Sequence, residues 1–336
     1  MRALVTGATG LVGSYLCERL RADGWHVRAL VRQPSAAAWV AADELAAGDV
    51  RDAAAFAAAA RGRDVIFHAA AVITPHGGWE AFQPNLVGTA NAVEAAVAAG
   101  ARLLQVSSVA VYGPGARYRA DGALIHEELP LEPLPDGAHY ARSKRESEEI
   151  ALGAHREGRA WVTAIRPCVV YGKHDRQFVP RVARSLRFGV APLLKGGRAT
   201  MTLVHAANVA DAAVRAATTD AAGGRAYNVA NDFPLPIADF MRLAGRGLGR
   251  RVHLVPLPFP IALAALSAVK VLKRRDGNVL MMARATVDFL TRDNPFTSER
   301  ARRELGWSPP VRLEAGVPEA FAEHRPRGAA PHASPA

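Results

Sequence analysis

The stretch RALVTGATGLVGSYLCERLRADGWHVRALVR, residues 2 to 32, decides the fold of this chain. Its first five residues form a short apolar run, which is typical of a strand buried on both faces of a sheet. A glycine-rich turn follows at residues 7–13, then a helix with Leu11, Leu16 and Leu20 on its buried face, and then a second apolar run at residues 26–31. A strand, glycine turn, helix and strand in this order predict the first unit of a dinucleotide-binding sheet.

The three glycines of the turn each have a physical role in such a unit. Gly7 allows a sharp turn, Gly10 allows the backbone to approach a pyrophosphate, and Gly13 allows the helix to close on the strand. The start of the helix offers unpaired N–H groups and the positive end of its dipole to the phosphates. Glycines alone would indicate only a tight turn, but their place between a strand and a helix favours nucleotide binding. The residues expected to contact the dinucleotide here are Gly7, Thr9, Gly10, Leu11, Val12 and Gly13.

The composition bounds the class of protein. The chain has 336 residues, of which 50% are hydrophobic, so it can bury a large core. A net charge of +11 is compatible with a nucleic-acid partner. The basic residues are nevertheless scattered, with no aromatic residues interleaved among them, and a general richness in Ala and Arg accounts for the charge. We therefore predict no nucleic-acid binding.

Two further features concern the cellular setting. Cys17 and Cys168 are the only cysteines and neither belongs to a metal-like cluster, so we expect no metal site and a reduced, cytoplasmic protein. No apolar run is long enough to span a membrane. The first strand begins at residue 2, which leaves no room for a signal peptide.

Strand and helix patterns alternate after residue 32. Strand candidates lie around Leu45 and at residues 64–68, 102–106 and 161–165, and helix candidates lie at residues 82–100 and 140–155. This alternation predicts an α/β fold with a Rossmann-type doubly wound parallel sheet.

The pattern changes beyond residue 172, where strands become shorter and prolines more frequent. We expect a dinucleotide-binding Rossmann domain over residues 1–172, to which some later segments return. A smaller C-terminal α/β substrate lobe would cover residues 173–324, with a helix at 178–188 and short strands at 202–205 and 226–229. The Pro/Ala-rich tail at residues 325–336 is predicted to be disordered.

One apolar segment of the second lobe leaves three interpretations open. In the segment 256–272, three prolines lead into a predicted apolar helix at residues 261–272, which is followed by Lys273, Arg274 and Arg275. The helix could line an apolar substrate pocket, touch an anionic membrane surface, or be an ordinary buried helix.

A tyrosine, a lysine and a serine are candidates for chemistry. Tyr140 and Lys144 are four residues apart on a predicted helix, so their side chains share one face. A neighbouring ammonium favours the phenolate, which would let Tyr140 act as an acid or base toward a carbonyl or alcohol. Ser107 and Ser108 end a strand, and Ser108 could polarise the same substrate oxygen. Taken alone, the tyrosine and lysine could be an exposed pair, and the serines could be turn residues.

Nine segments carry a family pattern in order along the chain: TGATGLVG from Thr6, GDVRD from Gly48, HAAA from His68, NLVGTANAVEAA from Asn85, SSVAVYG from Ser107, YARSK from Tyr140, RPCVVYG from Arg166, YNVAN from Tyr227 and LGWSPPVRLEAGV from Leu305. With these segments the sequence resembles the extended short-chain dehydrogenase/reductases, also called the NAD-dependent epimerase/dehydratase family. The resemblance covers about residues 2 to 323, nearly the whole chain.

The resemblance implies a role for each matching residue. Tyr140 would be the proton donor or acceptor, Lys144 would bind the nicotinamide ribose and lower the tyrosine pKa, and Ser108 would be the catalytic hydroxyl, with Ser107 as second choice. Asn85 would secure an internal turn or a water chain. The further cofactor contacts implied by the family are Asp49 and Val50 at the adenine, Ala69, Ala70 and Ala71 near the ribose, and Pro167 and Val169 at the nicotinamide.

The end of the second strand indicates which nucleotide is bound. An NAD enzyme usually has an acidic residue there that binds the ribose 2′-hydroxyl. This chain has Val31 and then Arg32, and an arginine suits a 2′-phosphate. We therefore favour NADP over NAD as the cofactor, although Arg32 could also be a solvent-facing residue of an Arg-rich protein.

Two branches of the family compete for the substrate. Lys195, Arg198 and Arg242 could hold the diphosphate of a nucleotide sugar. The ending of the second strand and the segment at residues 281–307 are instead similar to the branch of 3β-hydroxysteroid dehydrogenases and dihydroflavonol reductases. A dehydration reaction is disfavoured because a dehydratase usually needs an acidic residue close to the catalytic hydroxyl. In this chain the residues that follow Ser108 are Val109 and Ala110.

These observations predict an NAD(P)-dependent oxidoreductase that acts on an apolar, steroid-, terpenoid- or flavonoid-like secondary alcohol or ketone. One alternative is a nucleotide-sugar 4-epimerase with tightly held NAD, and another is a non-catalytic NADP-sensing regulator or assembly factor. By resemblance, two such chains would form a homodimer through the helices at residues 82–100 and 140–155.

Overall fold

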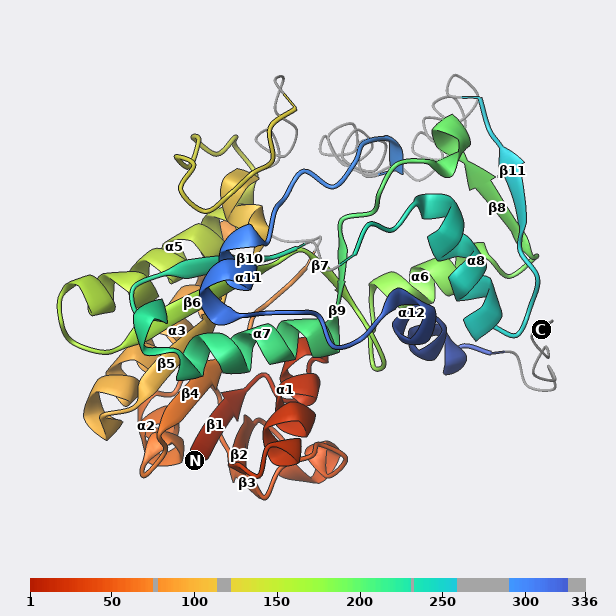
Figure 1. The fold of residues 1–336 in the computed structure, drawn as a ribbon. Helices are drawn as coiled ribbons and strands as arrows, with labels where there is room; N and C mark the ends of the chain where they lie inside the picture. Colours follow the sequence, from red (N-terminus) through yellow and green to blue (C-terminus); the bar gives the residue numbers. More distant parts are fainter. Residues whose placement is uncertain (75–77, 114–121, 231–232, 259–289, 326–336) are drawn as a thin grey trace. The chain divides into compact units, whose positions relative to one another are not determined.

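The computed structural model describes residues 1–74, 78–113, 122–230, 233–258 and 290–325 (Figure 1). The chain divides into two compact units, each built from three segments. Unit 1 contains Met1–Val170, Val204–Asp232 and Phe296–Pro310, and unit 2 contains Tyr171–Leu203, Phe233–Pro295 and Val311–Ala336. The boundary between a Rossmann domain and a substrate lobe at residues 172 and 173 remains a prediction from the sequence.

A seven-stranded sheet forms the centre of unit 1, and all its pairings are parallel. Its strand order is β10-β6-β5-β4-β1-β2-β3, so the chain runs from β1 to one edge and then returns to build the other half. This confirms the predicted doubly wound parallel α/β sheet. The strands are β1 (Arg2–Thr6), β2 (His26–Val31), β3 (Glu44–Ala47), β4 (Val65–His68), β5 (Arg102–Val106), β6 (Val162–Pro167) and β10 (Ala226–Val229).

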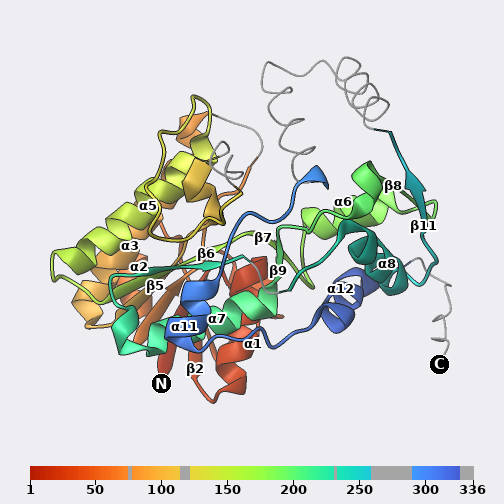
Figure 2. The ribbon, with the colours of Figure 1, turned by 45° about the horizontal axis from the view of Figure 1, so that its top comes forward.

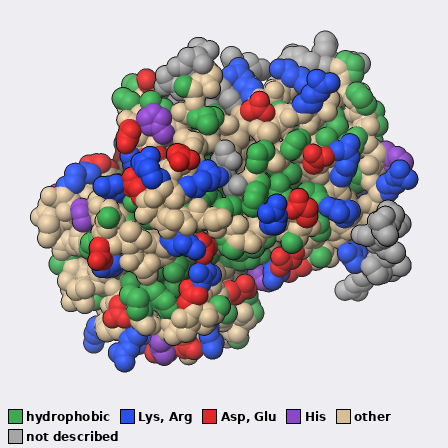
Figure 3. All heavy atoms as spheres, in the orientation of Figure 1, with side chains coloured by type: hydrophobic (Ala, Val, Ile, Leu, Met, Phe, Trp, Pro, Cys, Tyr) green, Lys and Arg blue, Asp and Glu red, His purple; other side chains and the backbone are tan. Residues whose placement is uncertain are grey.

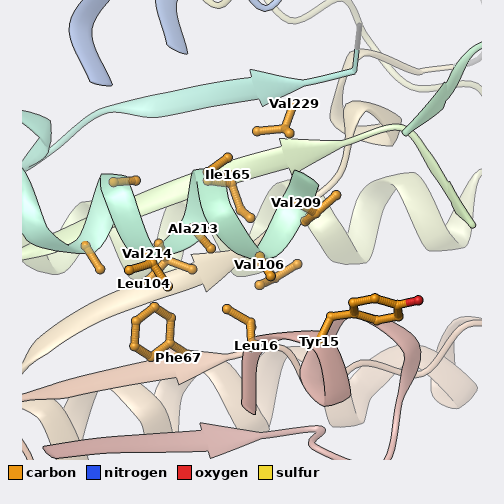
Figure 4. Packing of buried hydrophobic residues seen from close by; sticks show 14 of the residues in the cluster. Tyr15, Leu16, Phe67, Leu104, Val106, Ile165, Val209, Ala213, Val214 and Val229 are labelled. Atoms are coloured by element: carbon orange, nitrogen blue, oxygen red, sulfur yellow. The ribbon is translucent and has the colours of Figure 1, made fainter. Parts of the chain in front are cut away.

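Helices cover both faces of this sheet (Figures 1 and 2). On one face, α1 and α7 pack against a core that includes Leu16, Phe67 and Leu104 (Figure 4). On the other face, α2, α3 and α5 cover a second core with Leu4 and Phe56. The helices of unit 1 are α1 (Leu11–Ala22), α2 (Ala53–Ala60), α3 (Gln83–Ala99), α5 (His139–Arg156), α7 (Ala206–Thr218) and α11 (Glu299–Leu305), with short 3-10 turns η1 (Pro34–Ala37), η2 (Trp79–Phe82), η3 (Val109–Tyr112) and η5 (Asp220–Ala222).

Local sequence explains where these helices begin and end. The alanine-rich residues 53–60 form α2 because alanine has the highest helix propensity, and the Asp52 carboxylate caps it by accepting from the amides of Ala54 and Ala55 at 2.9 and 3.0 Å. Helix α3 ends at Gly100, which has a φ of 59° and serves as the expected stop.

Unit 2 has its own hydrophobic core around Phe240 and Phe321. Its elements are α6 (Phe178–Ser185), β8 (Val190–Leu193), η4 (Leu194–Gly197), α8 (Ile237–Gly247), β11 (His253–Pro256) and α12 (Leu313–Ala322). Strands β8 and β11 form a parallel pair. Strands β7 (Val169–Tyr171) and β9 (Leu203–His205) pair where the chain leaves and re-enters unit 1.

One expectation differs from the structure, and three concern segments that lie partly or wholly outside the described residues. Helix α6 ends at Ser185 rather than Phe188, because a turn with Gly189 at a φ of 71° follows it. Most of the apolar segment 256–272, part of the segment 281–307 and the tail after residue 325 lie outside the described residues. In the described parts of the chain, no helix combines the length and apolarity needed to cross a bilayer.

Candidate active site

The glycine turn lies between β1 and α1, and two of its glycines are required by close backbone approach. A Cβ atom on Gly7, whose φ is 67°, would lie 2.7 Å from the carbonyl carbon of Ala69 and from the amide nitrogen of Ala70. A Cβ on Gly13 would lie only 2.1 Å from the Gly7 carbonyl oxygen. The corresponding atom on Gly10 would meet nothing closer than that same oxygen, at 3.1 Å, so Gly10 leaves the most room for a ligand.

The start of α1 fits an anion. Gly10 is its N-cap residue and provides no side-chain hydrogen bond, and the first turn contains no acidic residue. Thr9 and Gly10 are exposed, and Leu11 and Val12 are half-buried. The first amides of the helix therefore lack an intrahelical acceptor and point, together with the positive end of the dipole, toward the turn. This arrangement fits the pyrophosphate of a dinucleotide.

Two charged side chains lie near the ends of β2 and β3. Arg32 is exposed directly after β2. Asp49 accepts from Nε and Nη2 of Arg51, each at 2.9 Å, and from the Arg51 amide at 2.9 Å. Hydrogen bonds from Arg51, assisted by the charge of Arg32, lower the Asp49 pKa to about 2. Asp49 is thus a permanent carboxylate, and its neighbour Val50 accepts from the Asn91 side chain at 2.9 Å.

The segment after β4 passes close to the glycine turn. Ala69 and Ala70 are half-buried and Ala71 is exposed. The Asn85 side chain holds the next residue: it accepts from the Val72 amide at 2.7 Å and donates to the Val72 carbonyl at 3.2 Å. This is an internal turn contact of the kind expected for Asn85.

Lys144 is almost completely buried, with 3% of its surface exposed, and lies on α5 beside the end of β5. Its Nζ donates to the Val106 carbonyl at 2.7 Å. Burial lowers the Lys144 pKa to about 8, and the nearby Glu148 carboxylate acts in the opposite direction. The side chain is therefore mostly charged at neutral pH. It contacts the end of β5, the strand that is directly followed by Ser107 and Ser108.

Ser108 joins the ends of two neighbouring strands. Its hydroxyl caps η3 by accepting from the Ala110 amide at 3.1 Å. The same hydroxyl donates to the Pro167 carbonyl at 3.4 Å. The second contact is at the long limit of a hydrogen bond, so the hydroxyl proton can be redirected at little cost. Ser107 is 3% exposed, and its Oγ has no hydrogen-bond partner among the residues that the structure describes.

Tyr140 lies in the first turn of α5, one helical turn before Lys144. Its side chain is half-buried, and its ring centroid is 6.2 Å from that of Phe82. Helix α5 is fixed to η3 by Arg145, which donates to the Val111 carbonyl at 3.1 and 2.6 Å. The structure thus brings Lys144, Ser108 and Pro167 to adjacent strand ends, with Tyr140 on the helix beside them. Val169, the last of the predicted cofactor contacts, follows β6, and its side chain is 36% exposed.

A buried polar network that the sequence interpretation missed supports this arrangement. Arg166 on β6 donates to both carboxylate oxygens of Glu148, at 3.0 Å from Nε and 2.5 Å from Nη2, and to the Tyr112 hydroxyl at 2.8 Å. Tyr112 in turn donates to the Asn228 side chain at 2.9 Å. A signal was present: Arg166 lies in a strand buried on both faces, and a fully buried charge requires a partner.

A second missed group is His68 at the end of β4. It is 1% exposed, and its Nδ1 is 2.8 Å from the Thr6 hydroxyl oxygen. The same Thr6 oxygen accepts from the Ala70 amide at 3.3 Å, so it links the histidine ring to the segment after β4. Burial, together with the charge of Lys144, lowers the His68 pKa to about 3, so the ring is neutral. Among the residues with described positions, no cluster of His, Cys, Asp and Glu could hold a metal ion.

Comparison with known proteins identifies relatives over the whole chain. A model described as NAD dependent epimerase/dehydratase family matches residues 3–230. A 4-hydroxy-2-methyl-3-oxo-4-farnesyl-3,4-dihydroquinoline-1-oxide ketoreductase of Stigmatella aurantiaca is 31% identical over 99% of both chains. A 3 beta-hydroxysteroid dehydrogenase/Delta 5-->4-isomerase of Mycobacterium tuberculosis is 28% identical over 92% of this chain and 86% of its own length.

Solved structures show the same fold. A dTDP-glucose 4,6-dehydratase from Streptomyces venezuelae, solved with NAD and TYD bound, superposes with a TM-score of 0.70 at 25% identity. The superposition covers 96% of each chain.

Proposed function

The chain belongs to the NAD dependent epimerase/dehydratase family and is an oxidoreductase of the extended short-chain dehydrogenase/reductase type, and from this premise we propose that it interconverts a ketone and a secondary alcohol through Ser108, Tyr140 and Lys144. The observation that carries the proposal is the buried Lys144 ammonium, held on the Val106 carbonyl at the strand end that leads into Ser108 and one helical turn after Tyr140.

Each side chain has one task in this proposal. A bound nicotinamide dinucleotide supplies or accepts the hydride. In the direction of reduction, Tyr140 gives its phenolic proton to the carbonyl oxygen, and the Lys144 charge stabilises the phenolate that remains. Ser108 donates a hydrogen bond to the same oxygen and polarises the carbonyl before the proton arrives.

The proposed substrate is an apolar ketone or alcohol. The names of two relatives, a ketoreductase of a farnesylated quinoline and a steroid dehydrogenase, support this choice. Val109 and Ala110, which follow Ser108, are 4% and 6% exposed and provide no acid for a dehydration step. Assays of NADPH oxidation with steroid, prenylated and long-chain ketones test the class, and mass spectrometry of co-purifying small molecules can identify the compound. Turnover of nucleotide sugars alone, with no net change in nicotinamide absorbance, would instead establish the 4-epimerase alternative.

We propose NADP rather than NAD as the cofactor. The exposed Arg32 directly follows β2, where an NAD enzyme usually has an acid. Replacing Arg32 with Ala should weaken NADPH binding about tenfold or more, as expected for the loss of a charge-assisted contact, and leave NADH binding nearly unchanged. Fluorescence titration with both cofactors measures this, and tighter binding of NADH by the unmodified protein would contradict the proposal.

A homodimer through α3 and α5 remains a proposal from family resemblance. Val87 and Val97 on α3 are 42% and 40% exposed, which leaves apolar surface for a second copy. Sedimentation analysis of the unmodified chain and of a Val87→Glu, Val97→Glu variant tests it, and a monomeric unmodified chain would exclude it.

A further inference from the structure

The positive charge of this chain is concentrated in one unit. Unit 1 contains 22 basic and 23 acidic residues and has a net charge of −1, whereas unit 2 contains 20 basic and 8 acidic residues and has a net charge of +12. The excess persists among the described residues of unit 2, which include 14 basic and 6 acidic side chains. An excess of this size creates a positive potential around the unit that attracts anionic partners.

Two segments of unit 2 carry basic residues without any acid to neutralise them. Residues 176–203, which include α6 and β8, contain six basic residues and no acidic one. Residues 240–258, which lead into β11, contain four basic residues and no acidic one. Strands β8 and β11 pair with each other, so the two segments lie side by side.

The turn between α6 and β8 presents an aromatic ring to solvent. Phe188 is 77% exposed, the largest value among the large hydrophobic side chains of the described residues. The Arg187 guanidinium lies 4.4 Å from the centre of its ring. The turn is firmly attached, because Arg250 donates to the Leu186 carbonyl at 3.4 Å and to the Arg187 carbonyl, and the His253 amide donates to the Gly189 carbonyl at 2.7 Å.

The strand pair extends this apolar surface. Ala191 and Leu193 point into the core of unit 2, so Val190 and Pro192 point outward. In the parallel register Pro192 lies opposite Val255, and Val190 and Val255 are 42% and 46% exposed. We call this surface the Phe188 patch, and its members are Arg184, Arg187, Phe188, Val190, Arg251 and Val255. In the part of the molecule that carries β8 and β11, Figure 3 shows Lys and Arg side chains next to hydrophobic ones.

We propose that the Phe188 patch docks this protein on an anionic lipid bilayer. The arginines would lie at the level of the negative headgroups, and Phe188, Val190 and Val255 would enter the boundary between headgroups and acyl chains. A nucleic acid is the less suitable partner, because the outward aliphatic residues have nothing to contact on a phosphate backbone and the patch has a single aromatic ring for base stacking. The inference does not depend on the proposed reaction.

Vesicle flotation tests the proposal with the full chain. The unmodified protein should float with vesicles of phosphatidylcholine and phosphatidylserine in a three-to-one ratio, should not float with phosphatidylcholine alone, and should be released by high salt. Each basic residue near an anionic surface contributes about fivefold to binding. An Arg184→Glu, Arg187→Glu, Arg251→Glu variant should therefore lose about a hundredfold or more, and Phe188→Ser should lose about fivefold or more while keeping the salt dependence.

A matched control separates the patch from overall charge. The variant Arg61→Glu, Arg156→Glu, Arg303→Glu changes the net charge by the same amount in unit 1 and should float nearly as well as the unmodified chain. Unchanged melting temperatures and NADPH binding show that all variants are folded. The proposal fails if the unmodified chain does not float at low salt, if both triple variants lose binding equally, or if duplex DNA binds more tightly than the vesicles and displaces them.

Discussion

At the scale of single residues, the proposed chemistry depends on Tyr140. A Tyr140→Phe variant keeps the ring that contacts Phe82 but cannot transfer a proton. We expect turnover to fall about 10²- to 10⁴-fold, the usual contribution of general acid–base catalysis, and cofactor affinity to stay within about twofold. Steady-state kinetics and fluorescence titration measure the two quantities. Turnover near that of the unmodified enzyme would show that another group moves the proton.

The two adjacent serines provide a matched comparison. Ser108→Ala removes the half-buried hydroxyl between the Ala110 amide and the Pro167 carbonyl, and it should lower kcat about 10- to 1,000-fold with little change in cofactor affinity. Ser107→Ala removes a buried hydroxyl that has no hydrogen-bond partner in the described part of the chain, so it should change kcat much less. A larger loss of kcat in the Ser107 variant would assign the catalytic hydroxyl to Ser107.

His68 predicts how stability depends on acid. Its pKa of about 3 in the folded chain lies below the ordinary 6.5, so between these values the unfolded chain binds more protons and acid favours unfolding. A His68→Gln variant lacks this titration. Between pH 6.5 and pH 4.5 the unmodified chain should lose about 2 kcal/mol more unfolding free energy than the variant. Urea unfolding at several pH values measures this, and parallel pH profiles would contradict it.

At the scale of elements, the ion pair of Glu148 and Arg166 joins α5 to β6. Both side chains are less than a tenth exposed. Burial acts against the charged guanidinium, but Glu148 and then Tyr112 outweigh it and raise the Arg166 pKa. Arg166→Met would leave the Glu148 carboxylate buried without its partner and should cost about 3–5 kcal/mol of unfolding free energy. The double variant Arg166→Met, Glu148→Leu should recover most of that loss in urea unfolding, and an equal loss in both variants would show that the pair itself supplies the stability.

The elements also show how far the sequence could predict this molecule. Local patterns were sufficient for the strands of the seven-stranded sheet, for the stop of α3 at Gly100 and for the glycine turn between β1 and α1, but they did not predict the short strands β7, β8 and β11. The sequence pattern predicted that Gly13 allows α1 to pack closely against β1. A Cβ atom on Gly13 would lie 2.1 Å from the Gly7 carbonyl oxygen, which agrees with that role. The pairing of Arg166 with Glu148, 18 residues earlier, and with Tyr112, 54 residues earlier, was not found, because such contacts depend on which strands become neighbours. For the same reason the convergence of the Tyr140 hydroxyl with Ser108 stays a prediction.

At the scale of the whole molecule, the chain does not finish one unit before it begins the other. Unit 1 takes β10 and α7 from residues 204–232 and α11 from residues 296–310. Strand β10 pairs with β6 from Ala226 opposite Ala164 to Val229 opposite Pro167. Helix α7 packs beside α1 over the centre of the sheet (Figure 4). The dinucleotide-binding unit is therefore incomplete until most of the chain has been made.

A chain that ends at Gly172 should consequently fail to fold. It lacks Val204, Val209, Val214, Tyr227 and Val229, all of which are nearly or fully buried in the core of unit 1. Burial of a large apolar side chain contributes roughly 1.5–3 kcal/mol, so these five account for about 7–15 kcal/mol, comparable to the whole stability of a typical domain. The truncated chain should show no cooperative thermal unfolding by circular dichroism and no NADPH binding. A chain that lacks only residues 326–336 is the control and should retain both properties, since no described core residue lies beyond Phe321. Cooperative unfolding together with cofactor binding in the chain ending at Gly172 would show that residues 1–172 form a domain by themselves, and that β10 and α7 add to its stability without being required for it.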